Sequence, residues 1–216
     1  GEGKMTYVND SGKPVETYNG DWHEGKMHGR GKYEYQDGGM YEGQWMDSKM
    51  HGKGVFVFAN QNRYEGDFVE DEKHGYGVLD YVNGERYEGH WRHDKAHGRG
   101  KLIYSTGDKY DGEWEGGKKE GQGEQVYANG DVYRGEWRND KATGQGSLIY
   151  ANGDVYEGEW LENLRSGNGR MTCAYDGYIY EGAWKEDRRH GGGGILFPNG
   201  DKLGGSWSNG SPSPGS

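Results

Sequence analysis

Cysteine, basic clusters and long apolar runs are all scarce in this sequence. A single cysteine, Cys173, excludes an internal disulfide framework and favours a reducing compartment. No run approaches the ~20 apolar residues of a membrane-spanning helix, and no signal-peptide pattern opens the sequence. With a net charge of −10 and no Lys/Arg block longer than two residues, the chain lacks the basic face of a nucleic-acid binder. We therefore expect a cytoplasmic protein that does not bind nucleic acid.

Catalytic motifs are also missing. The sequence contains no nucleophile elbow, P-loop or zinc-protease motif. The glycine run from Gly191 to Gly194 is not followed by the Lys-Ser/Thr pair of a phosphate-binding loop. We expect no enzymatic activity and no required cofactor.

Glycine and aromatic residues take the place of the usual aliphatic core. Only 30% of the 216 residues are hydrophobic, whereas the chain has 44 Gly, 18 Tyr and 8 Trp. Regular aromatic spacing argues against disorder, because disordered segments are poor in aromatic residues. A Tyr-x-Gly-x-Trp signature, with Phe68 once in place of Trp, begins at Tyr18, Tyr41, Tyr64, Tyr87, Tyr110, Tyr133, Tyr156 and Tyr180, and a worn copy begins at Leu203. The spacing is 23 residues except for one interval of 24, so the chain is a repeat array.

Each repeat is expected to form two antiparallel strands. In residues 41–45 Tyr, Gly and Trp alternate with polar residues, and the second strand begins near a Gly-x-Gly pair. Pairs such as Asn152-Gly153 predict two-residue hairpin turns, and the connection from Met46 to His51 is expected to be the longer loop. Stacked repeats then form an all-β, elongated, single-layer antiparallel hairpin solenoid, on the order of 80–90 Å long at about 4.8 Å per strand.

The combination of Tyr-x-Gly-x-Trp, Gly-x-Gly and a turn every 23 residues resembles the MORN repeat (membrane occupation and recognition nexus). The match runs from Gly1 to about Trp207, predicting about nine repeats in residues 1–207 and a disordered Ser/Pro/Gly tail in residues 208–216. Because the sequence opens midway through a repeat, we expect it to belong to a longer array. A free-standing array is most similar to the C-terminal repeats of apicomplexan MORN scaffold proteins, and that resemblance implies structural work at a cytoskeletal ring used in cell division.

The signature aromatic residues are expected to be mainly structural, with each glycine leaving bare backbone for a neighbouring ring. The groove that they line is also the candidate surface for an extended peptide. Its middle consists of Tyr110, Trp114, Tyr133, Trp137, Tyr156 and Trp160.

One repeat departs from the pattern at Cys173. An aromatic residue occupies the corresponding position in the other repeats, and the same repeat contains the one-residue insertion. Losing a ring from the packed face leaves a gap for a partner side chain or an ion. Cys173 is either a small buried hydrophobe or, with His190 and either Asp187 or Asp176, part of a zinc site shared between two chains.

Two further surfaces are candidate binding sites. The C-terminal end of the array, with Tyr180, Trp184, Leu203 and Trp207, is expected to pair with a second copy, because an open sheet edge invites association. A histidine-containing edge either caps its loops, with each imidazole bonding the backbone, or binds anionic phospholipid, although the chain's acidic charge weakens the second idea. Its residues are His28, Lys49, His51, Lys53, His74, Lys95, His97 and Arg99.

The preferred interpretation is a homodimeric, non-enzymatic cytoskeletal scaffold that is cytoplasmic and lies beneath the plasma membrane. Its expected partners are itself and cytoskeletal proteins, with weak or no membrane lipid. The alternatives are a peripheral phosphoinositide-binding module and a partner-binding regulatory appendage of an enzyme.

Overall fold

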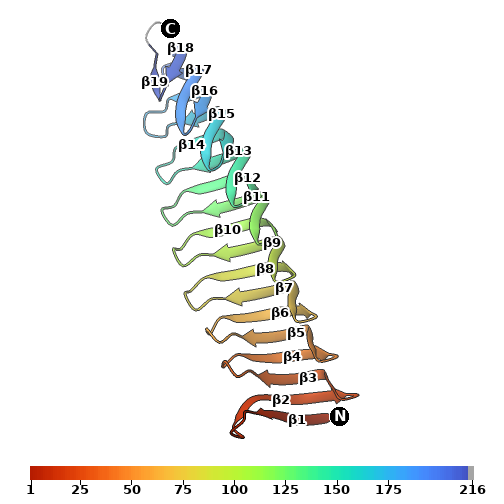
Figure 1. Ribbon diagram of the computed structural model, residues 1–216. Helices are drawn as coiled ribbons and strands as arrows, with labels where there is room; N and C mark the ends of the chain where they lie inside the picture. Colours follow the sequence, from red (N-terminus) through yellow and green to blue (C-terminus); the bar gives the residue numbers. More distant parts are fainter. Residues whose placement is uncertain (214–216) are drawn as a thin grey trace. The chain divides into compact units, whose positions relative to one another are not determined.

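The computed structural model describes residues 1–213, and every regular element in that range is a β-strand. The strands follow one another along the chain as an antiparallel meander within each of two units (Figure 1). The all-β hairpin repeat predicted from the 23-residue period is therefore confirmed.

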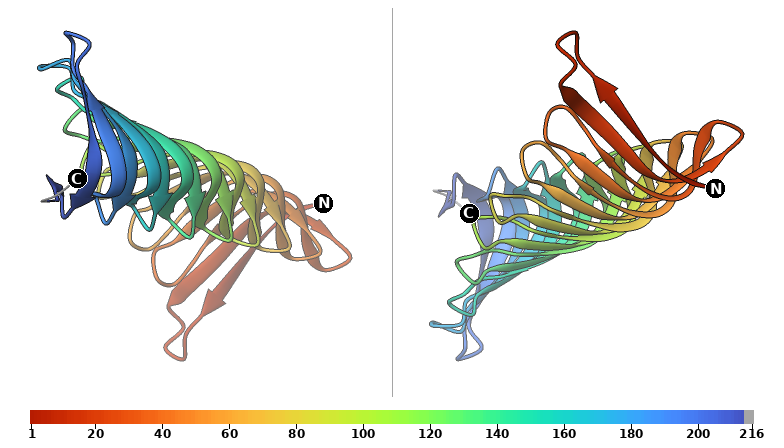
Figure 2. Two further views of the ribbon diagram at one scale, coloured as in Figure 1. Left: turned by 90° about the horizontal axis from the view of Figure 1, so that it is seen from above. Right: turned by 90° about the horizontal axis from the view of Figure 1, so that it is seen from below.

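The first unit comprises residues 1–105 and 115–117, and the second comprises residues 106–114 and the chain from 118 onwards. In the first unit, the β1–β2 hairpin projects past the hairpins that follow it (Figure 2). The strands are β1 (Glu2–Val8), β2 (Pro14–His23), β3 (Lys26–Glu34), β4 (Met40–Met46), β5 (Lys49–Val57), β6 (Arg63–Val69), β7 (Glu72–Asp80), β8 (Arg86–Arg92), β9 (Lys95–Ile103), β10 (Lys109–Glu115), β11 (Lys118–Val126), β12 (Val132–Arg138), β13 (Lys141–Ile149), β14 (Val155–Leu161), β15 (Leu164–Thr172), β16 (Ile179–Lys185), β17 (Arg188–Leu196), β18 (Lys202–Ser208) and β19 (Ser211–Pro212).

The core lies on one face of the sheet, which we call the inner face, and consists of the signature tyrosines and tryptophans. Five tryptophans each pack edge-on against the Tyr of their own repeat and the Tyr of the preceding one: Trp45, Trp91, Trp137, Trp160 and Trp184. Trp160, for example, lies 5.2 Å from Tyr156 and 5.1 Å from Tyr133, centroid to centroid. Its Nε1 donates to the backbone oxygen of Gly146 (3.1 Å). Such aromatic pairs add about 0.5–1.5 kcal/mol each beyond the area that they bury.

The spacing of the glycines, which recurs from repeat to repeat, follows from the position of the tyrosine ring. Tyr41 Oη donates to the backbone oxygen of Gln44 (2.9 Å), which lays the ring across Gly43 and Gly54. A Cβ on either glycine would overlap the phenol or the backbone of the facing strand. The prediction that glycine leaves bare backbone for a ring is thus confirmed, and the ring belongs to the same repeat.

The second strand of each repeat contains a bulge at the first glycine of the Gly-x-Gly pair. In β5 this is Gly52, whose φ is +64°, and the pairing with β4 shifts register there. Gln44 Oε1 accepts a hydrogen bond from Lys53 N (2.7 Å) and so fixes the bulge. Asp67 and Glu136 play the same part in their repeats. In these repeats the polar residue before the signature Trp or Phe therefore has a structural role, whereas Ala183 stands at this position before Trp184.

The predicted positions of the short and long turns were wrong. The connection at Met46 is a tight two-residue turn in which Asp47 and Ser48 have φ values of +50° and +67°, typical of type I′ geometry. Asn152-Gly153 lies in a three-residue loop, where Gly153 N donates to Tyr150 O (2.9 Å) and Gly153 has a φ of +91°. The glycine closes a three-residue loop that consists of a turn followed by a bulge. Asn-Gly is favoured in this loop as well as in two-residue turns, so the dipeptide alone did not identify the tight turn.

The expected disordered tail also differs in part from the structure. Residues after β18 turn back, and β19 pairs with β18 through Trp207–Pro212 and Ser208–Ser211. Residues 214–216 lie outside the described part of the chain. β19 covers only the C-terminal part of β18.

Candidate functional site

The predicted peptide-binding groove is the aromatic core itself. The six side chains Tyr110, Trp114, Tyr133, Trp137, Tyr156 and Trp160 are each between 0 and 7% exposed. A ring held between two other rings has little surface left for a ligand. This burial argues against direct partner contact by these residues, and it moves attention to places where the repeat pattern is interrupted.

The C-terminal end combines buried and exposed apolar groups. Tyr180, Trp184 and Trp207 are buried, whereas Leu203 is 47% exposed. Trp207 Nε1 is buried and, within residues 1–213, has no hydrogen-bond partner, unlike Trp184 Nε1, which donates to Gly169 O (3.1 Å). Residues 202–205 pair with β17 on one side, and β19 begins its pairing only at Trp207. Among residues 1–213, the start of β18 is therefore paired on one side only and lies beside an exposed leucine.

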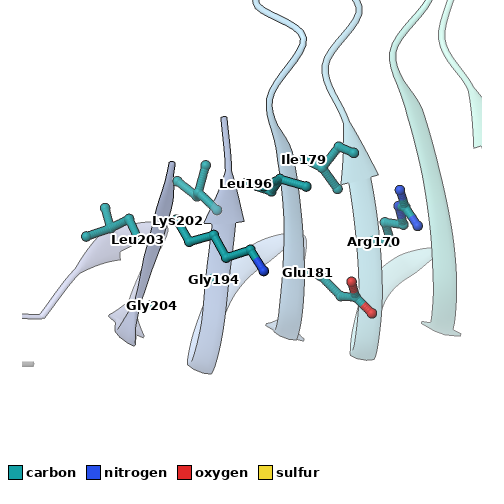
Figure 3. Close-up of a pocket in the computed structure, with 9 residues that line it drawn as sticks. Arg170, Ile179, Glu181, Gly194, Leu196, Lys202, Leu203 and Gly204 are labelled. Atoms are coloured by element: carbon teal, nitrogen blue, oxygen red, sulfur yellow. The ribbon is translucent and has the colours of Figure 1, made fainter. Parts of the chain in front are cut away.

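The opposite, outer face of this end is hollowed. Gly194 and Gly204 face each other across β17 and β18, at positions where earlier repeats carry side chains such as Arg170 and Glu181. The hollow has a volume of about 490 Å³. Figure 3 shows Ile179 beside Leu196 at its rim. Because Gly194 and Gly204 have no side chains, the backbone is uncovered in this hollow. Ile179 and Leu196 form an apolar border around it, next to the first residues of β18.

Charged groups surround this outer hollow without neutralising one another. Arg170, Glu181 and Lys202 line it, and none of them forms an ion pair within residues 1–213. Elsewhere on the outer face charges are paired, as in Arg134 Nε–Glu124 Oε2. These side chains remain available to a partner.

A second hollow, on the inner face, lies at Cys173 and has a volume of about 310 Å³. Met171, Tyr178 and Arg189 are among its walls. A hydrogen bond with Cys173 raises the pKa of the Tyr178 hydroxyl, and burial adds to the rise. The gap expected from the loss of a ring at Cys173 is therefore present.

The predicted zinc ligands are not assembled within one chain. Asp187 Oδ1 accepts hydrogen bonds from Arg165 N (2.9 Å) and Nε (3.0 Å), and His190 is exposed and does not line the Cys173 hollow. Among residues 1–213, no group of three or more His, Cys, Asp or Glu side chains is placed to hold a metal ion. A zinc ion shared between two chains stays a prediction.

The predicted lipid edge carries less free positive charge than its sequence indicates. Lys49 Nζ lies 3.3 Å from Glu70 Oε2, and Lys53 Nζ lies 2.7 Å from Asp67 Oδ1. The Nδ1 atoms of His28 and His51 are buried without a hydrogen-bond partner in the described chain. Lipid binding at this edge also stays a prediction. No helix long and apolar enough to span a membrane occurs among the residues that the structure describes.

One functional feature was missed at the sequence level: a column of residues between successive Tyr and Trp rings. It reads Met27, Met50, Lys73, Ala96, Lys119, Ala142, Arg165 and Arg189. The basic members lie over aromatic faces, with Arg165 Cζ 4.6 Å from the Trp184 centroid and Arg189 Cζ 4.6 Å from the Trp207 centroid. Writing the repeats one above another would have revealed this column.

Lys119 is the most buried cation of the column. It is 9% exposed, and its Nζ donates to Gln125 Oε1 (2.6 Å), a side chain that is 3% exposed. Burial lowers the pKa of Lys119 to about 8, while Asp140 and Asp108 oppose that change. A polar pair therefore replaces the Ala–Leu pair of the following repeat, Ala142 and Leu148.

The family comparison agrees with this geometry. The model of the MORN repeat matches residues 18–40, 41–63, 64–86, 87–109, 110–132, 133–155, 156–174 and 180–202. The matches cover most of the chain, and each begins at a signature tyrosine. This chain belongs to the MORN-repeat family. A comparison with curated proteins gives no match.

Solved structures give resemblances of fold alone. The TCP10 domain of Danio rerio CPAP in complex with a peptide of STIL is 12% identical, with a TM-score of 0.49, and the match covers 95% of this chain and 100% of that chain. The SAS-4 TCP domain of Drosophila melanogaster in complex with a proline-rich motif of Ana2 is 16% identical, with a TM-score of 0.46, covering 73% and 85%.

Proposed function

We propose that this MORN array is a non-enzymatic cytoskeletal scaffold that forms a homodimer through its C-terminal repeats. The observation that supports the dimer is the partly covered strand β18, whose residues 202–205 pair on one side only within residues 1–213, beside the exposed Leu203. A second copy of β18 would satisfy that edge and bury the leucine in one isologous contact.

The scaffold role rests on the resemblance of the array to cytoskeletal MORN proteins. Tyr and Trp side chains are committed to packing between repeats, and the charged outer surface and the hollows remain for other molecules. In this proposal the dimer organises a cell-division ring structure in the cytoplasm, beneath the plasma membrane, through cytoskeletal protein partners.

The test is a substitution at the open edge with a matched control. Leu203→Lys places a charge in the proposed contact, and Leu161→Lys makes the same change at a leucine that is 60% exposed on β14. In sedimentation equilibrium, Leu203→Lys is expected to weaken dimerisation at least about tenfold, a loss of about 1.4 kcal/mol, and Leu161→Lys to leave it unchanged. Equal dimerisation of both variants would place the interface elsewhere.

A further inference from the structure

The hollow at Cys173 has an internal template one repeat earlier. Tyr150 occupies the position that corresponds to Cys173, and it lies beside the Arg165–Asp187 pair: burial raises the pKa of Tyr150, Arg165 opposes the rise and Asp187 adds to it. Asp187 Oδ1 accepts from Arg165 Nε (3.0 Å). A ring, a guanidinium and a carboxylate thus form one cluster on the inner face.

In the next repeat the guanidinium alone is retained. Cys173 replaces the ring, Gly210 replaces the carboxylate and Arg189 corresponds to Arg165. At Gly210 the backbone is unchanged, since Gly210 N donates to Arg189 O (2.9 Å) as Asp187 N donates to Arg165 O (3.1 Å). At Cys173 the following loop is one residue longer than the loop after Tyr150, and Cys173 N donates to Tyr178 O where Tyr150 N donates to Asp154 O. The ring and the carboxylate are missing, and all three residues of this second cluster line the same hollow.

Three arginines (Arg165, Arg188 and Arg189) and two carboxylates (Asp154 and Asp187) line the hollow. Asp187 is paired with Arg165, and Asp154 Oδ1 accepts a hydrogen bond from Ala174 N. Arg189 Cζ lies 5.3 Å from the Tyr180 centroid and 4.6 Å from the Trp207 centroid, so its position is set by the core. Within residues 1–213 neither Arg189 nor the neighbouring Arg188 forms an ion pair, whereas Arg165 has Asp187. Compared with the preceding repeat, the hollow therefore lacks the aromatic side chain at position 173 and the carboxylate at position 210, and Tyr178 lies at its wall, hydrogen-bonded with Cys173.

We propose that the Cys173 hollow is a socket for a partner polypeptide that presents an aromatic side chain next to a carboxylate. The ring fills the space that Tyr150 fills one repeat earlier, between Met171 and Tyr178. The carboxylate pairs with Arg189 as Asp187 pairs with Arg165, and this charge-assisted bond selects acidic partners. The socket lies within one chain and does not depend on dimerisation.

The probe for this socket is N-acetyl-tyrosine, which carries a ring and a carboxylate in one molecule. N-acetyl-tyrosinamide lacks the carboxylate, and N-acetyl-leucine lacks the ring. Binding to the full chain is followed by the amide chemical shifts of Cys173, Arg189 and Gly210 in NMR titrations. We expect saturable shifts with N-acetyl-tyrosine, and at least about tenfold weaker binding of the other two probes.

Two variants make the test specific to the socket. Cys173→Tyr restores the ring of the repeat pattern, so it is expected to fold with a raised melting temperature and to lose probe binding. The pair Tyr150→Cys and Asp187→Gly reproduces both losses one repeat earlier and is expected to create a second binding event reported by the amide of Arg165.

Several results would overturn the proposal. These are unsaturable shifts in the wild-type chain, equal binding of the three probes, or binding to Cys173→Tyr within about twofold of wild type. Failure of the Tyr150/Asp187 variant to gain binding while it remains folded would also do so. Conversion of a dimer to a monomer by Cys173→Tyr would assign the socket to a second copy instead of a separate partner.

Discussion

At the scale of single residues, the fold depends on tyrosines that are buried yet hydrogen-bonded through their hydroxyl groups. Tyr41 and Tyr156 are fully buried, and each donates to a backbone oxygen three residues further along the chain. A phenolate in this position would lose its donor and would be poorly solvated. The protonated hydroxyl groups of this tyrosine column therefore contribute to the free energy of unfolding.

Alkaline titration should reveal this column. Burial raises the pKa of Tyr18 and of Tyr35 to about 12, and it raises the pKa of Tyr64 further. The unfolded chain releases these protons near pH 10, the ordinary tyrosine pKa. Above pH 10 the unfolded state therefore binds fewer protons than the folded state. The contribution of these tyrosines to the free energy of unfolding is complete below pH 10 and falls as the pH rises above it.

The measurement is tyrosinate absorbance followed together with β-sheet circular dichroism. Exposed tyrosines such as Tyr175, which is 98% exposed, should titrate first and without loss of structure. The remaining tyrosines should ionise only as the sheet unfolds. Smooth titration of all tyrosines near pH 10 with an intact sheet would contradict the burial described above.

The pair of Lys119 and Gln125 gives a pH dependence of the opposite sign. The pKa of Lys119 is about 8 in the folded chain and 10.5 as an unperturbed group. Between these values the unfolded chain binds more protons, so the free energy of unfolding should rise with pH from about 8 towards 10. Replacing Lys119 by Ala should abolish that rise in chemical denaturation curves.

The same pair also tests how a buried polar contact is tolerated. Gln125→Leu removes one hydrogen-bond acceptor of Lys119 Nζ and should lower the free energy of unfolding by about 1–3 kcal/mol. Adding Lys119→Ala recreates the Ala–Leu pair of the following repeat and should restore the wild-type value or exceed it. A double variant less stable than Gln125→Leu alone would show that the polar pair is itself required.

At the scale of strands, close approach of the tyrosine ring explains why some glycines are obligatory and others are not. Gly54 lies under the ring of Tyr41, whereas a Cβ on Gly204 would have no heavy atom within 4 Å. Gly54→Ala should therefore destabilise the protein by about 1–3 kcal/mol through overpacking, and Gly204→Ala should be close to neutral. Equal effects in thermal unfolding would remove the steric explanation.

The 23-residue period was sufficient to predict the strands, but hydrogen bonding within the repeat decided the turns. Gly52 takes a left-handed conformation inside β5, and the resulting bulge absorbs residues that were expected in a loop. That conformation is held by the hydrogen bond from Lys53 N to Gln44 Oε1. This contact joins two neighbouring strands and cannot be inferred from the alternation of residue types along one strand. The two connections were consequently exchanged in the prediction.

The candidate sites were predictable to the extent that they are interruptions of the repeat. The change at Cys173 correctly indicated a gap, because a missing ring leaves space in any packed column. The supposed aromatic groove was less predictable, since a Trp can be enclosed by rings from two repeats, as Trp160 is between Tyr133 and Tyr156. The burial of Lys119 depends on that same enclosure.

At the scale of the whole molecule, we propose that packing and recognition belong to different parts of the chain. The regular repeats bury their aromatic residues, and the C-terminal repeats carry the open edge of β18 and both hollows described there. Self-association and partner binding are therefore proposed for the end where the repeat pattern is interrupted.

The most direct test of this account is the molar mass of the wild-type chain in solution, by size exclusion with light scattering. The measurement is made over a range of concentrations, with and without a chelator. The account predicts a mass near twice the 24.2 kDa of one chain, and a shared zinc ion would add release of monomer on chelation. A mass near 24.2 kDa at every concentration, in both conditions, would contradict the homodimeric scaffold.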